Sequence, residues 1–174
     1  MKKLEYIIVS MIMFLVFIIL QINVFNNLPI LGIVPDLFII LSVYIAILAD
    51  DKVLPCVLII TYGLIYDIAY SSTICLSALI GFLIVIITME FCNRVLVEVK
   101  IGMMIYVFVC TICSELFIGI INIILSNTFY DIFSFILSVL IISAYNFVLT
   151  LFIHPILSSK IKESNNQTRI IRKY

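Results

Sequence analysis

The sequence predicts an all-α integral membrane protein with six transmembrane helices, and three observations support this fold class. Hydrophobic residues make up 65% of the 174 residues and charged residues only 11%, which is more apolar surface than a water-soluble domain of this size can bury. Six apolar runs, each near the roughly 20 residues that cross a bilayer, occupy most of the chain. All ten Lys and Arg residues lie at the two ends or in two of the five gaps between these runs.

The six predicted spans are bounded by polar, charged or turn-forming residues, and their length distinguishes them from strands. The first run follows Lys2 and Lys3 but is too long for a signal peptide and lacks a small-residue cleavage site, so we expect a retained helix. Pro35 and Pro55 fall in the first turns of the second and third spans, where a missing N–H costs little. The predicted spans are residues 4–24, 31–49, 53–70, 74–92, 101–125 and 132–157, which form one domain of residues 1–157.

The basic residues predict the orientation of these spans. Lys52 lies in the second gap, Arg94 and Lys100 lie in the fourth, and the other three gaps contain no basic residue. Because positive charge is retained on the cytoplasmic side of a bilayer, six spans with both termini in the cytoplasm satisfy the whole pattern. Residues 158–174 then form a basic cytoplasmic tail, which attracts anionic lipid headgroups at about 1 kcal/mol per basic residue near the surface. The tail residues predicted to contact the membrane surface are Lys160, Lys162, Arg169, Arg172 and Lys173.

Composition and motifs argue against several classes of function. The net charge is zero, and the sequence contains neither a basic-aromatic strip nor a Gly-rich phosphate loop, so we expect no nucleic-acid partner and no cofactor. The cysteines lie in or beside apolar runs, where we interpret them as packing residues rather than as a disulfide framework or a redox motif. No nucleophile and base are spaced for catalysis, so we expect a protein without enzymatic activity. Recognition is left to helix faces, short turns and the tail.

Asp67 is a candidate contact residue because carboxylates inside the membrane are costly and mark functional or structural sites. Gly63 lies four residues earlier and therefore on the same helix face. A small residue beside a carboxylate lets another helix approach closely and donate hydrogen bonds to it. We expect a carboxylate satisfied within the fold near the interface, with contact to a partner or ligand as the alternative.

Glu115 lies near the middle of the fifth span, within a polar stripe that should face the bundle interior or a partner helix. This stripe consists of Thr111, Glu115, Gly119, Asn122 and Ser126. The sixth span offers a similar stripe, which consists of Ser143, Asn146, Thr150 and His154. If the stripes face each other, a hydrogen bond between Glu115 and Asn146 joins the two spans, and it is worth about 0.6 to 2 kcal/mol. The alternative is a proton or ion pathway through Glu115.

Two further carboxylates stand at the predicted beginnings of helices. Asp36 directly follows Pro35, and Asp131 precedes the sixth span. A carboxylate at a helix N-terminus is stabilised by the helix dipole and by free backbone N–H groups. We therefore interpret both residues as helix caps.

Two short motifs resemble the rod shape-determining MreD family. They are Pro35-Asp36-Leu37 at the start of the second span and Gly63-Leu64-Ile65-Tyr66-Asp67 in the third. The resembling features cover roughly residues 31 to 92, and the turn Ser71-Ser72-Thr73 stands where that family often has a Gly. The resemblance implies a bacterial inner-membrane protein with a six-helix fold like that of the substrate-binding subunits of energy-coupling-factor transporters. It also implies a non-enzymatic role in lateral peptidoglycan synthesis beside MreC, MreB filaments and the elongation glycosyltransferase and transpeptidase.

The sequence therefore predicts a membrane scaffold that binds other membrane proteins through its helix faces. On the resemblance, Pro35, Asp36, Gly63 and Asp67 are expected contact residues, together with Glu115, Asn122 and Asn146 from the polar stripes. The rival class is a substrate-capture subunit of a vitamin transporter, for which Asp36, Tyr70, Ser71, Asn127 and Tyr130 could supply ligands. Such a subunit should have small residues in the first span for docking its energising partner. This span instead has the bulky Met11, Met13, Phe14 and Phe17.

Overall fold

The computed structural model describes residues 3–27, 29, 32–49, 51–70, 75–92, 100–126 and 131–171, and it describes the backbone alone for 91, 92, 100, 125, 126 and 158–171. In these residues the chain forms six α-helices and no β-sheet, which confirms the predicted all-α class. The helices are α1 (Lys3–Asn23), α2 (Leu37–Leu48), α3 (Val53–Tyr70), α4 (Leu76–Cys92), α5 (Lys100–Ser126) and α6 (Ile132–Ile171), with a short 3-10 turn, η1 (Phe25–Asn27), after α1.

Four segments are long and apolar enough to cross a membrane, and the chain is accordingly a multi-pass membrane protein. These segments are Lys3–Asn27, Val53–Tyr70, Ile101–Ile124 and Ile132–Leu157. The apolar helices α2 and α4 are shorter. At 1.5 Å per residue, the 12 residues of α2 extend about 18 Å, well below the roughly 30 Å of a hydrocarbon core.

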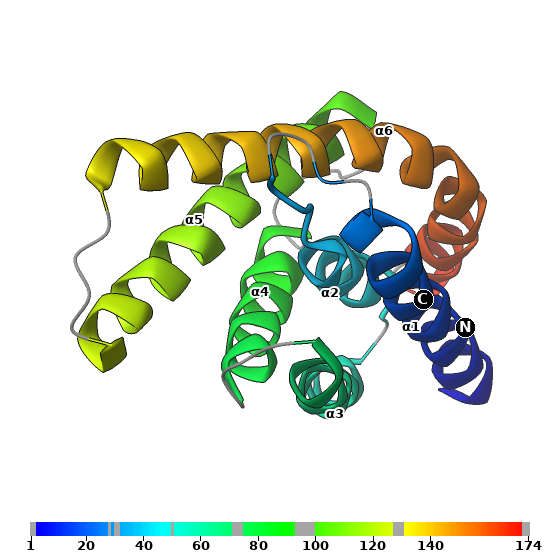
Figure 1. Ribbon diagram of the computed structural model, residues 1–174. Helices are drawn as coiled ribbons and strands as arrows, with labels where there is room; N and C mark the ends of the chain where they lie inside the picture. The colour runs from blue at the N-terminus through cyan, green and yellow to red at the C-terminus, as the bar shows by residue number, and fades with distance from the viewer. Residues whose placement is uncertain are drawn as a thin grey trace.

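Helix α2 is the centre of the molecule. It contacts α1, α3, α4, α5 and α6, and Figure 1 shows it enclosed among its neighbours. Eleven of its 12 residues are buried. A helix that is apolar on all faces is stable only where other elements cover it on every side. The shortest helix is thus covered by protein, whereas the long helices carry the lipid-facing surface.

The helix boundaries agree with the predicted spans at α3 and differ at α2 and α6. Helix α2 begins at Leu37, six residues after the predicted start of that span. Pro35 precedes the N-cap instead of standing in the first turn, so its predicted place was wrong. The reason is local, because Asp36 caps the helix at the next residue. Helix α6 continues through residues 158–171, so most of the predicted tail is helical.

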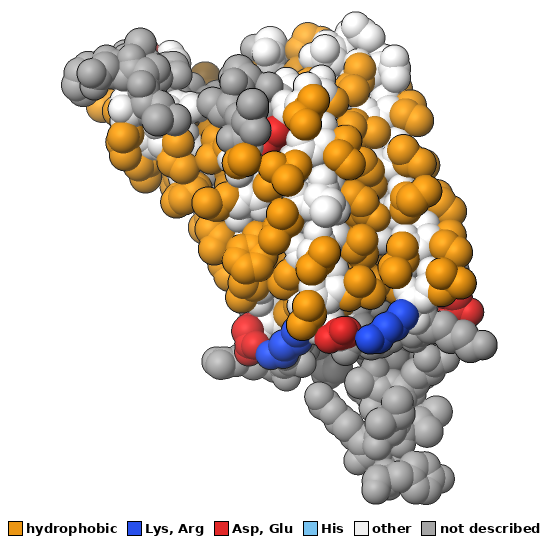
Figure 2. All heavy atoms as spheres, turned by 90° about the horizontal axis from the view of Figure 1, so that it is seen from below, with side chains coloured by type: hydrophobic (Ala, Val, Ile, Leu, Met, Phe, Trp, Pro, Cys, Tyr) orange, Lys and Arg blue, Asp and Glu red, His pale blue; other side chains and the backbone are white. Residues whose placement is uncertain are grey.

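The molecular surface separates into an apolar band and a charged rim. Figure 2 shows hydrophobic side chains over most of the visible face and Lys, Arg, Asp and Glu side chains gathered along its lower edge. Two exposed ion pairs lie in this rim: Lys3 to Asp51 at 4.0 Å and Lys52 to Glu90 at 2.6 Å. We call this side the basic end. The opposite side, which contains the cavities described below, is called the cleft end. Exposed ion pairs add at most about 1 kcal/mol each to the stability of a protein. Here they are informative because they mark the polar boundary of the apolar surface.

Candidate functional site

The beginning of α2 is held by its own cap and by α1. Asp36 is the N-cap, and its Oδ1 accepts the Phe38 N–H at 2.9 Å, as predicted for a capping carboxylate. Gln21 of α1 binds the same turn through two hydrogen bonds of its side chain. Its Nε2 donates to the Pro35 carbonyl at 2.8 Å, and its Oε1 accepts the Leu37 N–H at 3.1 Å. Non-helical backbone at this depth in a membrane needs such partners, because lipid supplies none.

Gly63 and Asp67 join α3 to the first turns of α4. A Cβ added to Gly63 would meet the Ala78 Cα and would lie 2.6 Å from the Ala78 N, so the two backbones touch at this glycine. Asp67 is 1% exposed. Its two carboxylate oxygens accept the Ser77 N–H at 3.3 and 3.2 Å. The expected close helix approach beside a hydrogen-bonded carboxylate is confirmed. Ser71, on the same predicted face, lies outside the described residues.

Asn146 links three helices and does not bind Glu115. Its Nδ2 donates to the Asp36 carbonyl and to Thr111 Oγ1, both at 3.1 Å. Its Oδ1 is buried without a hydrogen-bond partner. The predicted bond between Glu115 and Asn146 is therefore wrong, because the Asp36 carbonyl at the start of α2 lies within reach of Asn146 and accepts its amide. The α6 stripe of Ser143, Asn146, Thr150 and His154 does face the interior, and each of these residues is buried.

Two cavities lie on either side of α5 toward the cleft end. The first, of about 240 Å³, lies among α1, α2, α3, α4 and α5. The second, of about 350 Å³, lies between α5 and α6. Glu115, Ile118 and Asn122 of α5 line both, so we treat the pair as one feature and call it the polar cleft. Its other polar lining residues are Gln21, Asp36, Tyr66, Tyr70, Ser77, Asp131, Ser134 and Ser138.

The charges of the polar cleft have one sign. Asp36, Glu115 and Asp131 line it, and no Lys, Arg or His is among the described residues of its walls. Asp131, directly before α6, accepts the Ser134 hydroxyl at 2.8 Å. These acids do not form a metal centre, since no three His, Cys, Asp or Glu side chains of the described residues are grouped to hold an ion.

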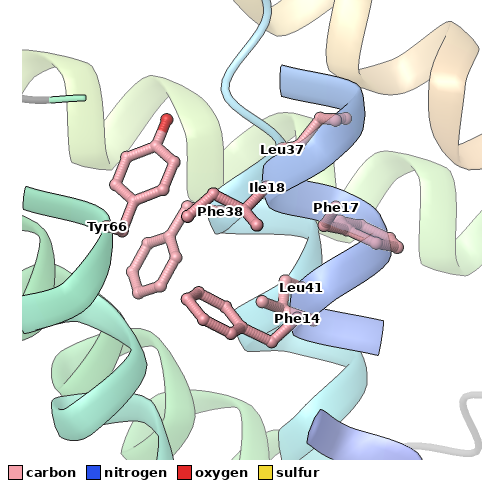
Figure 3. Close-up of a pocket in the computed structure, with 7 residues that line it drawn as sticks. All are labelled: Phe14, Phe17, Ile18, Leu37, Phe38, Leu41 and Tyr66. Atoms are coloured by element: carbon pink, nitrogen blue, oxygen red, sulfur yellow. The ribbon is translucent and has the colours of Figure 1, made fainter. Parts of the chain in front are cut away.

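Tyr66 separates the polar cleft from an apolar contact between α1, α2 and α3. Its ring stacks on Phe38 with centroids 5.1 Å apart. In Figure 3 its hydroxyl points away from the apolar side chains around it, which are Phe14, Phe17, Ile18, Leu37, Phe38 and Leu41. The space among these residues is about 10 Å³, about enough for a single water. The apolar side of Tyr66 is thus packed core, and its polar side faces the cleft.

The remaining predicted residues lie apart from the cleft or outside the described chain. Lys160, Lys162 and Arg169 are in the C-terminal part of α6, where only the backbone is described. Arg172 and Lys173 lie outside the described residues, as do Asn127 and Tyr130. The sequence reasoning missed Gln21 and Tyr66. An amide near the end of an apolar span is a signal for interhelical hydrogen bonding, and Gln21 carries that signal.

Replacing Gln21 with leucine should destabilise the protein by about 2 to 3 kcal/mol, because the Pro35 carbonyl and the Leu37 N–H are left buried without partners. The measurement is unfolding in mixed detergent micelles, followed by circular dichroism. Asn23→Leu is the matched control. Asn23 is exposed and donates only to the Ile19 carbonyl of its own helix, so its loss should cost under about 0.5 kcal/mol. Equal effects of the two substitutions would contradict the bracing role of Gln21.

Comparison with protein-family models, with curated proteins and with solved structures gives no match.

Proposed function

We propose that this chain is a non-enzymatic membrane scaffold of the bacterial cell-elongation machinery, required for rod shape and lateral peptidoglycan synthesis. It acts through helix-face contacts with MreC, and through that assembly with MreB filaments and the elongation glycosyltransferase and transpeptidase. The observation that carries this proposal is the structural use of the residues on which the MreD resemblance rests. Asp36 caps the buried α2, and Gly63 and Asp67 join α3 to α4.

The proposed topology has six spans, with both termini on the cytoplasmic side of the bacterial inner membrane. Helix α2 alone is too short, but residues 32–36 before it are not helical and can add up to about 16 Å when extended. That sum is sufficient to cross the hydrocarbon core. The ion pairs of Lys3 with Asp51 and of Lys52 with Glu90 gather three predicted cytoplasmic segments at one end, which supports this orientation. The likeness to the substrate-binding subunits of energy-coupling-factor transporters stays a prediction.

Lateral contact is the mode of action that the described surface favours. Large hydrophobic side chains are exposed on every helix except the central α2. Some of this surface faces lipid, and some is available to neighbouring membrane helices. In a membrane, helices associate by packing and by interhelical hydrogen bonds, since lipid and protein are equally apolar.

Depletion of the protein in its own bacterium is the test of this proposal. Depleted cells should lose the rod form and become round. A photocrosslinking amino acid in place of Ile120 on α5 or Ile8 on α1, which are 57% and 49% exposed, should crosslink to MreC from at least one of these faces. Rod-shaped growth after depletion, together with no crosslink to MreC from exposed positions on any of the five outer helices, would refute the proposal.

The alternative is a substrate-capture subunit of a vitamin transporter, and one observation favours it. The cavity of about 240 Å³ presents Asp36, Tyr66 and Tyr70 together near the cleft end, as a small polar ligand would require. The first span counts against it, because α1 presents bulky Met11 to the surface and buries Phe14 and Phe17. Thermal stabilisation of the purified protein by a single B vitamin at micromolar concentration, and copurification of an ATPase, would favour transport.

A further inference from the structure

The polar cleft is lined by three carboxyl groups, and hydrogen bonds among the described residues account for two of them. The Asp36 carboxylate accepts the Phe38 N–H. Asp131 accepts from Ser134. Glu115 is partly buried in the wall shared by both cavities, and no hydrogen bond or ion pair joins its carboxyl group to another of the described residues. A carboxylate at such a place in a membrane protein needs a donor or a cation.

A second acceptor without a donor lies beside the cleft. Asn146 is 0% exposed, and its Oδ1 is unpartnered. The Nδ2 of the same carboxamide is bonded to the carbonyl of Asp36, so this oxygen lies close to the Asp36 backbone. Buried polar atoms nearly always have partners. Asn146 itself lines neither cavity. The unpaired carboxyl group that does line them is Glu115, and it favours an occupant that brings donors, hence an ammonium or guanidinium group rather than an anion.

The N-terminus of α2, which lies at the cleft, does not make the cleft a site for an anion. The start of a short helix in a membrane often binds an anionic ligand through its free N–H groups. Here Asp36 already fills that position as the N-cap, and Gln21 takes the Leu37 N–H. The partial positive charge of α2 is therefore matched by a carboxylate of the chain itself. Glu115 stays as the carboxyl group that the described walls do not pair.

The geometry of α5 leaves the cleft accessible from the side. Helix α5 packs mainly against α6 and only slightly against α4. Figure 1 shows its far part, toward Ser126, leaning away from α1–α4 and diverging from the start of α6. Glu115 lies about 22 Å along the helix axis from Lys100, which is roughly two-thirds of the way across a hydrocarbon core of about 30 Å. A side chain reaching Glu115 at that depth comes most directly from a neighbouring membrane helix.

We propose that the polar cleft receives a Lys or Arg side chain from a membrane-spanning helix of a partner protein, and that Glu115 binds its charged group. This inference rests on the proposed role as a lateral scaffold and names the contact through which one partner is selected. Charge complementarity argues for the occupant, because the cleft is acidic and its described walls contain no cation. A basic residue in a membrane helix is costly when alone, and Glu115 removes that cost only for a partner that carries the charge at the matching depth.

The test uses the full-length protein in phosphatidylcholine vesicles and designed transmembrane peptides as partners. One peptide is a leucine–alanine helix with a single Lys about 15 residues from its cytoplasmic end. A second has Leu at that position, and a third has the Lys one helical turn from the end. Association is measured by energy transfer between labelled peptide and protein. The chain is compared with Glu115→Gln and with Glu90→Gln, a control that removes an acid of similar size at the basic end.

The unmodified chain should bind the deep-Lys peptide about five- to tenfold more tightly than the other two. Glu115→Gln should abolish this preference, and Glu90→Gln should leave it unchanged. Equal binding of the three peptides would overturn the proposal, as would a preference that survives in Glu115→Gln. If butylammonium ion alone raises the melting temperature of the unmodified chain but not of Glu115→Gln, the cleft is a small-cation site and helix docking is wrong. None of these outcomes depends on cell shape or on crosslinking to MreC, so failure of the docking proposal can be distinguished from failure of the proposed scaffold role.

Discussion

Substituting Gly63 with alanine should destabilise the fold by about 1 to 2 kcal/mol, although alanine is the better helix former. The added methyl group would collide with the Ala78 Cα and N, which are backbone atoms of α4 and move only if the whole helix moves. Overpacking of this kind costs about 1 to 3 kcal/mol, and it exceeds the roughly 1 kcal/mol that alanine gains over glycine in helix propensity. Gly63→Leu should prevent α3 and α4 from packing at all.

Gly81→Ala is the matched control for Gly63→Ala, since both glycines lie in buried parts of apolar helices. The Cβ at Gly81 would approach Phe38 Cε1 at 2.8 Å and Ile59 Cγ1 at 3.0 Å. These are side-chain atoms that can shift, so we expect a loss under about 1 kcal/mol. The measurement is reversible unfolding in mixed micelles together with the melting temperature. If Gly63→Ala is as stable as Gly81→Ala, the close α3–α4 approach is not required.

Asp67→Ala is expected to cost about 3 kcal/mol, the largest loss among single polar substitutions in this chain. Asp67 is 1% exposed, and both of its oxygens accept the Ser77 N–H at the start of α4. Removing the carboxylate deletes a helix cap, worth about 1 kcal/mol. The same N–H is partly buried, and leaving it without a partner places the total cost at the upper end of about 1 to 3 kcal/mol. Asp67→Asn keeps one acceptor oxygen and should recover about half of the loss.

The control for Asp67 is Asp51→Ala, another acidic side chain at the beginning of a helix. Asp51 accepts the Val53 N–H at 3.4 Å in an exposed position, where water can replace it, so we expect a loss under about 1 kcal/mol. Under the proposed function, Asp67→Leu and Gly63→Leu should also lose the crosslink to MreC, whereas Asp51→Ala should retain it. Unchanged unfolding of Asp67→Ala relative to Asp51→Ala would show that α4 does not depend on this cap.

The number and approximate limits of the helices could be predicted from the sequence because both depend on local properties. An apolar run of about 20 residues that ends in charged residues forms a helix in a membrane irrespective of its neighbours. Helix α3 therefore begins and ends where its apolar run does. The shared helix face of Gly63 and Asp67 could also be predicted from the sequence, because a spacing of four residues places two side chains on one helix face in any fold.

The partners of Glu115 and Asn146 could not be predicted, because each depends on which helix lies opposite. Two polar stripes on adjacent spans suggested a direct bond between them. In the fold, α2 approaches the same place, and its Asp36 carbonyl takes the Asn146 amide. Helix α2 begins directly after that carbonyl, at Leu37. The interpretation of Asp36 as a cap is consistent with this start, but the sequence does not show that Asn146 of α6 lies opposite it.

The sequence by itself determined that this chain is built of apolar helices with its basic residues at the chain ends and in two of the gaps between apolar runs, since hydrophobicity and charge act residue by residue. Tertiary structure alone decided that the shortest helix lies at the centre and that Asp36 and Glu115 line one cleft. The physical reason is that every predicted span is apolar enough to face lipid. Backbone contact at Gly63 and interhelical hydrogen bonds, among them those of Gln21, Asp67 and Asn146, decide which faces meet.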